Sequence, residues 1–259
     1  MTRAPTWLLS AILAVVLLAL WEGAVRLFAI PVIVIPPPSA VAAALWQGFG
    51  NGELVANFWI TLAEVVLGLI AGAAFGLVAG ALIGLFPLLE RTLYPYIVAF
   101  QTVPKVAIAP IFVVWFGFGI ASKVVITATI AFFPVLANTI MGLRAAPAEQ
   151  VDLMLALTAS RWQVLRMVRF PQALPYVFVG LDVAIVLAVI GAIVGEFVGA
   201  QGGLGFLILQ HDFNFDMPGV FAILVLLSAL GTGLHWIVTA TQRRVVFWLH
   251  DPAHRTIGA

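Results

Sequence analysis

The sequence predicts an all-α integral membrane protein, folded as a bundle of six membrane-spanning helices. Of its 259 residues, 63% are hydrophobic and only 9% are charged, and the mean hydropathy is +1.16. This composition is typical of chains that reside in a lipid bilayer. Because a span needs about 20 apolar residues, residues 1–259 are expected to form a single transmembrane domain without a separate soluble domain.

Composition also excludes several classes of function. The net charge is +1 and the basic residues are spread over the connections, so nucleic-acid binding is not expected. The chain has no cysteine, which excludes disulfides and thiolate metal sites, and we expect no metal or other cofactor on it. It has no Gly-x4-Gly-Lys-Ser/Thr loop, so we do not expect an enzyme, and any ATP-driven function would need another chain.

The apolar runs locate the predicted spans. The first run lacks a convincing small-residue cleavage site and is interpreted as an uncleaved span, with Glu22 and Arg26 paired near its far end. Three consecutive prolines then precede Ser39, which is expected to cap a short helix at the membrane interface. The predicted spans are 7–28, 57–86, 96–118, 124–143, 176–198 and 219–240.

Glycine repeats every four residues along the second span. Such a stripe lets another helix approach backbone to backbone, as in other small-x-x-x-small interfaces. We therefore expect this span to pack inside the bundle, against a helix of the same chain or of a second copy. The glycines of the stripe are Gly68, Gly72, Gly76, Gly80 and Gly84.

Four ionisable residues lie inside the predicted spans. A charge at mid-helix costs at least about 2.5 to 3.5 kcal/mol, so each needs a partner, water or a role. Lys105 lies near the midplane of the third span, which prolines interrupt. It either forms a buried ion pair with Glu64 or Asp182, or faces a pathway where it attracts an anion, since irregular backbone at membrane depth is tolerated along a cavity. The candidate pathway residues are Lys105, Glu64, Asp182 and Glu196.

Residues 144–175 form one long polar interruption that cannot itself be embedded in the membrane. The pattern predicts two short helices joined by a tight turn. Ser160 would open the second helix, with Gln163 completing a capping box. Pro171 and Pro175 are expected to end that helix and to begin the next apolar run.

The second of these short helices is predicted to be amphipathic. Trp162, Leu165 and Val168 share one face, while the arginines lie largely elsewhere. Such a helix pair could dock on a soluble partner. The alternative is a helix that lies on anionic lipid by its arginines.

The distribution of charge orients the predicted bundle. With six spans, nine arginines fall on the side of the termini and of the 144–175 loop, against only Arg26 and Lys123 on the other side. The positive-inside rule therefore places both termini and the loop in the cytoplasm. The nine are Arg3, Arg91, Arg144, Arg161, Arg166, Arg169, Arg243, Arg244 and Arg255.

The polar loop resembles a known motif. Its pattern is Asp152-Leu153-Met154-x3-Thr158-x9-Val168-x-Phe170-Pro171. It is similar to the Glu-Ala-Ala-x3-Gly-x9-Ile-x-Leu-Pro loop of the permease subunits of binding-protein-dependent ABC importers, where the loop forms the coupling helix that sits in a groove of the cytoplasmic ATPase. The turn glycine is Thr158 here, and a β-branched residue would incur a steric penalty at positive φ. The resemblance implies ATPase contacts at Glu149, Asp152, Thr158, Ser160, Arg161, Trp162 and Leu165.

Further segments resemble the nitrate, sulfonate and taurine branch of that family, whose relatives also serve pyrimidine- and riboflavin-type substrates. They are residues 104–110 (PKVAIAP) followed by 115–119 (WFGFG), and 194–198 (VGEFV) followed by 203–205 (GLG). The similarity runs from about residue 57 to 240. It implies the fold of a type I ABC importer permease and a pathway for a small anionic or aromatic solute.

The resemblance also implies partners and a location. These are a homodimeric pore in the bacterial inner membrane, two ATPase subunits that bind ATP and Mg²⁺, and a soluble substrate-binding protein outside. The alternative from the residues alone is a stand-alone secondary transporter or a membrane-embedded interaction protein. A secondary transporter more often has paired broken helices in both halves, and the broken third span has no evident counterpart in the sixth.

Overall fold

The computed structural model describes residues 6–248, in which all regular structure is helical. Five helices there are long and apolar enough to cross a membrane, and α4 with α5 supplies a sixth span if the bent pair counts as one. The predicted all-α membrane fold is therefore confirmed. The helices are α1 (Thr6–Leu27), α2 (Pro38–Gly50), α3 (Glu53–Leu85), α4 (Pro87–Thr102), α5 (Lys105–Phe116), α6 (Ile120–Arg144), α7 (Ala148–Ala156), α8 (Arg161–Val164), the π-helical turn η1 (Leu165–Arg169), α9 (Phe170–Gly199), α10 (Leu204–Phe213) and α11 (Met217–Val245). Two arginines of the charge count, Arg3 and Arg255, lie outside the described residues.

The third predicted span is divided between two helices. Helices α4 and α5 meet at 91° across Val103 and Pro104. A proline restricts the residue before it to extended backbone, and Val103 accordingly has φ −66° and ψ 125°. The break places Lys105 at the first position of α5.

The described chain forms two compact units. One contains residues 6–61 and 201–229, and the other contains residues 62–200 and 230–248. Helices α3 and α11 contribute to both units, because each crosses a boundary.

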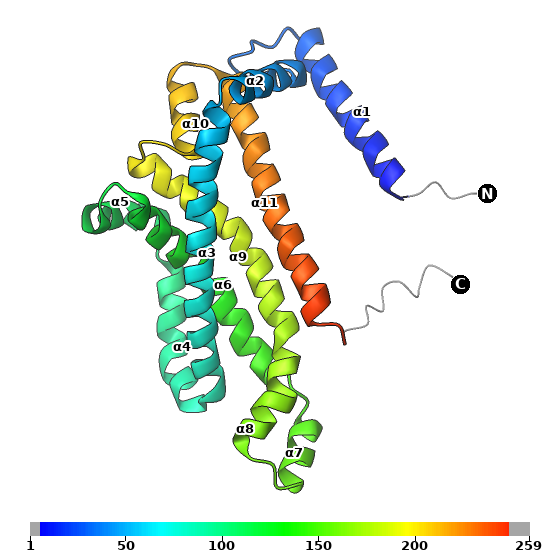
Figure 1. The fold of residues 1–259 in the computed structure, drawn as a ribbon, viewed down its shortest axis with the longest axis vertical. Helices are drawn as coiled ribbons and strands as arrows, with labels where there is room; N and C mark the ends of the chain where they lie inside the picture. Colours follow the sequence, from blue (N-terminus) through cyan, green and yellow to red (C-terminus); the bar gives the residue numbers. More distant parts are fainter. Residues whose placement is uncertain (1–5, 249–259) are drawn as a thin grey trace, which may run out of the picture. The chain divides into compact units, whose positions relative to one another are not determined.

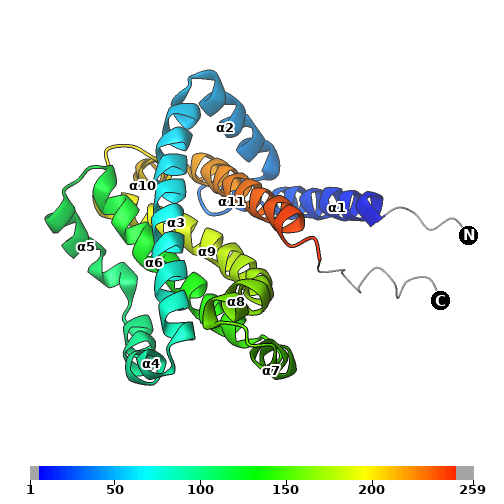
Figure 2. The same cartoon turned by 60° about the horizontal axis from the view of Figure 1, so that its bottom comes forward.

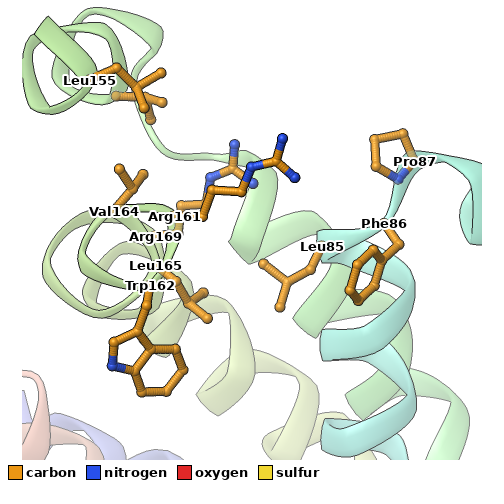
Figure 3. A pocket seen from close by; sticks show the side chains of 10 residues that line it. Leu85, Phe86, Pro87, Leu155, Arg161, Trp162, Val164, Leu165 and Arg169 are labelled. Atoms are coloured by element: carbon orange, nitrogen blue, oxygen red, sulfur yellow. The ribbon is translucent and has the colours of Figure 1, made fainter. Parts of the chain in front are cut away.

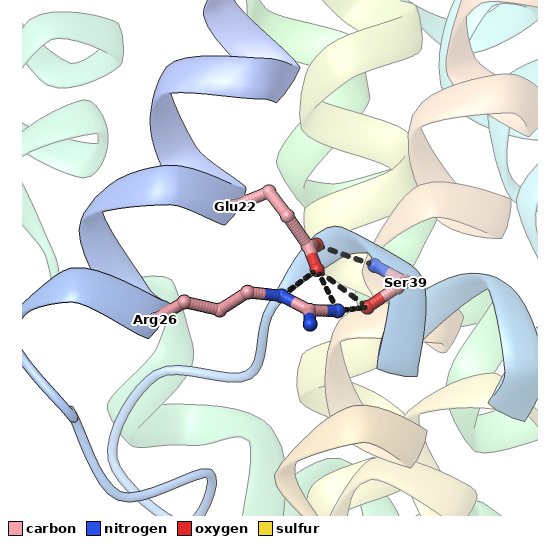
Figure 4. Close-up of polar contacts among 3 residues, drawn as sticks. All are labelled: Glu22, Arg26 and Ser39. Atoms are coloured by element: carbon pink, nitrogen blue, oxygen red, sulfur yellow. Dashed lines mark hydrogen bonds and ion pairs between the residues drawn. The ribbon is translucent and has the colours of Figure 1, made fainter.

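In the first unit, a polar contact joins α1 to α2 (Figure 4). Glu22 accepts hydrogen bonds from the backbone N–H of Ser39 at 3.0 Å and from its hydroxyl at 2.8 Å, and Arg26 pairs with the same carboxylate. The cap position of α2 is Pro37, which makes no side-chain cap. The prediction that Ser39 caps this helix is wrong, because Glu22 supplies the acceptor for the helix start from another helix.

Side chains at the start of α3 hold the start of α10 in the same unit. The Asn57 side-chain oxygen accepts from the Gly203 N–H at 2.6 Å, and the Thr61 hydroxyl accepts from the Leu204 N–H at 2.7 Å. Gly203 has φ +110°, a backbone conformation that favours glycine. These bonds satisfy amides that a helix N-terminus leaves without partners.

Helix α6 is the central helix of the second unit, and the glycine stripe of α3 lies against it (Figures 1 and 2). A Cβ atom on Gly72 would lie 2.7 Å from the Ala128 carbonyl oxygen, and one on Gly76 would lie 2.6 Å from that of Phe132. The stripe therefore brings two backbones together within one chain.

Helix α9 approaches α6 in the same way. A Cβ atom on Gly180 would lie 2.8 Å from the Pro134 carbonyl oxygen, and one on Gly191 would lie 2.9 Å from Cα of Thr127. Helix α6 is thus packed closely by glycines from two neighbours, which explains the burial of much of its length.

The π-helical turn η1 joins α8 directly to α9. In it, the Phe170 N–H donates to the carbonyl of Leu165, five residues earlier. A proline cannot donate, and its ring crowds the carbonyl four residues back, so a wider turn just before Pro171 relieves that conflict. The helix runs through from Arg161 to Gly199. The prediction that Pro171 and Pro175 end the second short helix is therefore wrong.

Candidate functional site

The polar loop begins with α7, which ends in a tight left-handed turn. Thr158 has φ +60°, its N–H donates to the Leu155 carbonyl, and the Ala159 N–H donates to the Met154 carbonyl. This pair of bonds is a Schellman motif, in which the residue after the C-cap is usually glycine. Thr158 occupies the position of the glycine in the motif that the loop resembles, and it adopts the glycine conformation.

The second helix of the loop opens as its sequence predicts. The Ser160 hydroxyl accepts from the Gln163 N–H at 3.3 Å, and the Gln163 side-chain oxygen accepts from the Ser160 N–H at 2.7 Å. The predicted capping box is confirmed. It fixes the orientation of α8 immediately after the turn.

The loop presents most of its predicted contact residues to the outside. Trp162 and Val168 were predicted to share one face of the second short helix, but they do not. Trp162 is 67% exposed, whereas Val168 is 8% exposed. Val168 lies within the π-helical turn, whose wider winding shifts its register relative to Trp162. Exposed in the structure are Glu149, Asp152, Thr158, Ser160, Arg161 and Trp162, while Leu165 is half-buried.

A cavity of about 490 Å³ lies between the loop and the end of α3 (Figure 3). Leu85 lines it from the end of α3, Phe86 from the residue that follows, and Leu155 from α7. Arg161 and Arg169 extend into the space between α8 and the end of α3 (Figure 3).

Glu64, Lys123 and Glu196 come together from α3, α6 and α9. They are 3%, 1% and 1% exposed. The two carboxyl groups lie beside each other and beside the Lys123 ammonium group.

Lys123 also anchors the ends of neighbouring segments. Its ammonium group donates to the carbonyl of Phe118 at 2.5 Å and to that of Gly199 at 2.7 Å. Gly195 leaves room for it, because a Cβ atom there would lie 3.1 Å from Cγ of Lys123. The cluster is buried within the bundle, and the Oε2 atom of Glu64 has no hydrogen-bond partner among the described residues.

The Asp182 carboxylate is hydrogen-bonded to the His235 ring, and this contact joins α9 to α11. Both side chains are about half exposed, and the Thr239 hydroxyl lies 3.5 Å from the second ring nitrogen of His235. The sequence identified Asp182 as a candidate pathway residue but predicted no partner for His235.

Lys105 lies apart from these acidic residues. Its ammonium group is 5.8 Å from the centre of the Phe133 ring, at a distance typical of a cation–π contact. Among the described residues it forms no ion pair, so the structure brings neither Glu64 nor Asp182 to it. Phe112 and Trp115 follow on the same helix, with ring centres 6.1 Å apart.

Lys123 is the residue that sequence reasoning missed. It precedes an apolar run and looks like part of an exposed turn. The available signal was its spacing, because Lys123 and Thr127 share a helix face, four residues apart. No group of three metal-ligand side chains occurs in the part of the chain that the structure describes.

Comparison with known proteins identifies the family to which this chain belongs. Residues 72–247 match the family described as binding-protein-dependent transport system inner membrane component. The chain is 36% identical over 232 residues to the riboflavin transport system permease protein RibX of Chloroflexus aurantiacus, covering 90% of this chain and 87% of that protein. It is 35% identical over 215 residues to the formylaminopyrimidine transport permease protein ThiX of Halalkalibacterium halodurans, covering 83% and 85%.

Two further similarities agree with this assignment. The chain is 31% identical over 244 residues to the taurine transport system permease protein TauC of Escherichia coli, covering 90% of this chain and 86% of that protein. Its fold is similar to a chain of the inward-facing MetNI methionine ABC transporter, with a TM-score of 0.64 at 24% identity over 77% of this chain and 97% of that one. Because the family match spans well over half of the sequence and several relatives exceed 30% identity over most of their length, the chain belongs to the family of binding-protein-dependent transport system inner membrane components, the permeases of ABC importers.

Proposed function

We propose that this chain is the transmembrane permease subunit of an ATP-driven importer and that α7 and α8 dock on its ATPase. The observation that carries the proposal is the exposed apolar surface of the loop, inside the family segment 72–247. Leu153, Leu157 and Trp162 are 61%, 67% and 67% exposed. Large apolar side chains on a polar loop outside the membrane indicate a protein partner. Family membership sets aside the stand-alone secondary transporter.

The remaining partners follow from the same role. A second copy of the chain would complete the pore, and residues 1–259 would act as one transmembrane domain. Two ATPase subunits would bind ATP and Mg²⁺ in the cytoplasm, and a soluble binding protein would deliver the solute from outside. The nine arginines predicted on one side support a cytoplasmic loop and cytoplasmic termini in a bacterial inner membrane.

The solute that we propose is small and either anionic or aromatic. The names of the relatives include riboflavin, formylaminopyrimidine and taurine, which are ring compounds or carry an acidic group. Lys105 beside Phe133 offers a cation next to an aromatic ring, which suits both classes. Such a site must be weak, because a solute has to leave as readily as it enters. Identifying the solute that the associated binding protein holds would test this class directly.

Two substitutions test the docking surface. Trp162→Ala removes an exposed aromatic anchor on α8, and Asp152→Arg reverses an exposed charge on α7. Each should weaken ATPase association by about 2 kcal/mol or more, roughly 30-fold. The measurements are ATPase co-purification and stimulation of ATP hydrolysis by the loaded binding protein.

Matched variants control for general damage to the surface. Trp236→Ala alters a tryptophan that is 72% exposed on α11, and Asp212→Arg reverses an exposed charge on α10. Both should leave co-purification intact. Normal co-purification and stimulated hydrolysis in the Trp162 and Asp152 variants would show that the ATPase docks elsewhere.

A further inference from the structure

The cavity between the end of α3 and the polar loop is apolar on most sides. Leu85 at the end of α3 and Phe86 just after it form one wall, while Leu155 and Val164 belong to the wall on α7 and α8. Its volume of about 490 Å³ is that of a small-molecule site. A ligand here would bury hydrocarbon against several side chains.

Two arginines supply the charge of this cavity. Arg161 and Arg169 line it, and in the described part of the chain neither forms an ion pair. By contrast, Arg144 nearby is held by Glu90. Asp152 lines an adjoining cavity with Arg169 rather than this one. Two guanidinium groups without carboxylate partners match the oxygens of a phosphate group.

The ends of two spans flank the cavity. Helix α3 has 33 residues, and the helix from Arg161 to Gly199 has 39. At 1.5 Å per residue α3 is about 50 Å long, longer than the hydrocarbon core of about 30 Å. Part of α3 therefore extends beyond the hydrocarbon core.

We propose that this cavity binds an anionic phospholipid. The phosphate lies between Arg161 and Arg169, and the upper part of an acyl chain packs on Leu85, Phe86 and Leu155. Basic pockets at the cytoplasmic ends of spans bind anionic lipid head groups by this chemistry. Free phosphate would engage the arginines but leave the apolar walls uncovered. The site goes beyond the proposed function.

Trp162 provides a reporter inside the cavity. The full-length chain, with any ATPase that copurifies, is placed in nanodiscs that contain brominated phosphatidylglycerol or brominated phosphatidylcholine. Subtracting the fluorescence of a Trp162→Phe variant isolates the quenching of Trp162. We expect phosphatidylglycerol to quench it at lower mole fractions than phosphatidylcholine.

The double variant Arg161→Gln/Arg169→Gln should greatly weaken that preference. Each arginine near an anionic surface contributes about fivefold to affinity, so losing both should reduce the preference about 30-fold. Arg166→Gln is the matched control, because Arg166 lies on the same turn outside the cavity lining. It should keep the preference.

Three outcomes would overturn the proposal. The first is equal quenching of Trp162 by the two lipids, as expected if the copurified ATPase fills the cavity. The second is a preference that survives in the double variant. The third is displacement of brominated phosphatidylglycerol by added inorganic phosphate, which would identify a site for the free anion.

Discussion

Lys123 and Lys105 show how differently two lysines are accommodated in apolar helices. Lys123 is 1% exposed and is bonded to two carbonyls beside two carboxyl groups. Lys105 is half-buried, at the start of a helix and over an aromatic ring. The first arrangement satisfies the charge internally, whereas the second leaves it open to a passing anion.

Lys123→Met should destabilise the protein. It leaves an uncompensated carboxylate among buried side chains, which typically costs about 3 to 5 kcal/mol. Thermal unfolding of the purified complex would measure this loss, and adding Glu196→Gln should recover part of it. A Lys123→Met protein that melts like the wild type would show that the cluster contributes little.

Lys105→Met should behave in the opposite way. We expect a stable and correctly assembled complex with impaired transport, because Lys105 has no carboxylate partner in the described chain. Solute uptake into proteoliposomes and the melting temperature would be measured together. Loss of stability, or normal uptake, would remove Lys105 from the pathway.

Thr158 occupies a turn position whose left-handed backbone favours glycine. A non-glycine residue in the left-handed region costs about 1 to 2 kcal/mol. The Schellman bonds to Leu155 and Met154 nevertheless hold Thr158 at φ +60°. The turn therefore keeps its geometry without the glycine, because hydrogen bonds at the helix end outweigh the local steric cost.

The pair α3 and α6 depends on the absence of side chains between the helices. Gly76→Leu should disrupt it, because even a Cβ atom would lie 2.6 Å from the Phe132 carbonyl oxygen. We expect loss of the assembled complex in size-exclusion chromatography and loss of transport.

Gly233→Leu is the control for this prediction. Gly233 lies on α11, and a Cβ atom there would meet nothing within 4 Å. This variant should assemble normally. Normal assembly and transport of the Gly76 variant would mean that α3 can move away from α6 without cost.

At the scale of elements, the glycine stripe and the capping box can be predicted from the sequence, because each depends on residues that are close together in the chain. The π-helical turn before Pro171 could not be predicted from the sequence. A proline pattern shows that a regular helix is interrupted, but packing decides whether the chain stops or continues through a wider turn.

At the scale of the whole molecule, charge asymmetry predicts the orientation of the chain in the membrane. The sequence has no cysteine, so single cysteines can report it. Leu157→Cys in the polar loop and Phe213→Cys at the end of α10 replace side chains that are 67% and 79% exposed. A membrane-impermeant maleimide added outside intact cells should label only the Phe213 position, and labelling of the Leu157 position instead would reverse the topology.

The sequence by itself determined the membrane class, the approximate helices, the packing stripe of α3 and the exposed loop, since these follow from composition and from patterns within a few turns. Only the tertiary structure decided which charges meet. Asp182 and His235 are 53 residues apart, and Lys123 reaches a carbonyl 76 residues away. A buried charge must find a partner, but sequence patterns do not show which one, because that depends on which helix faces lie in contact.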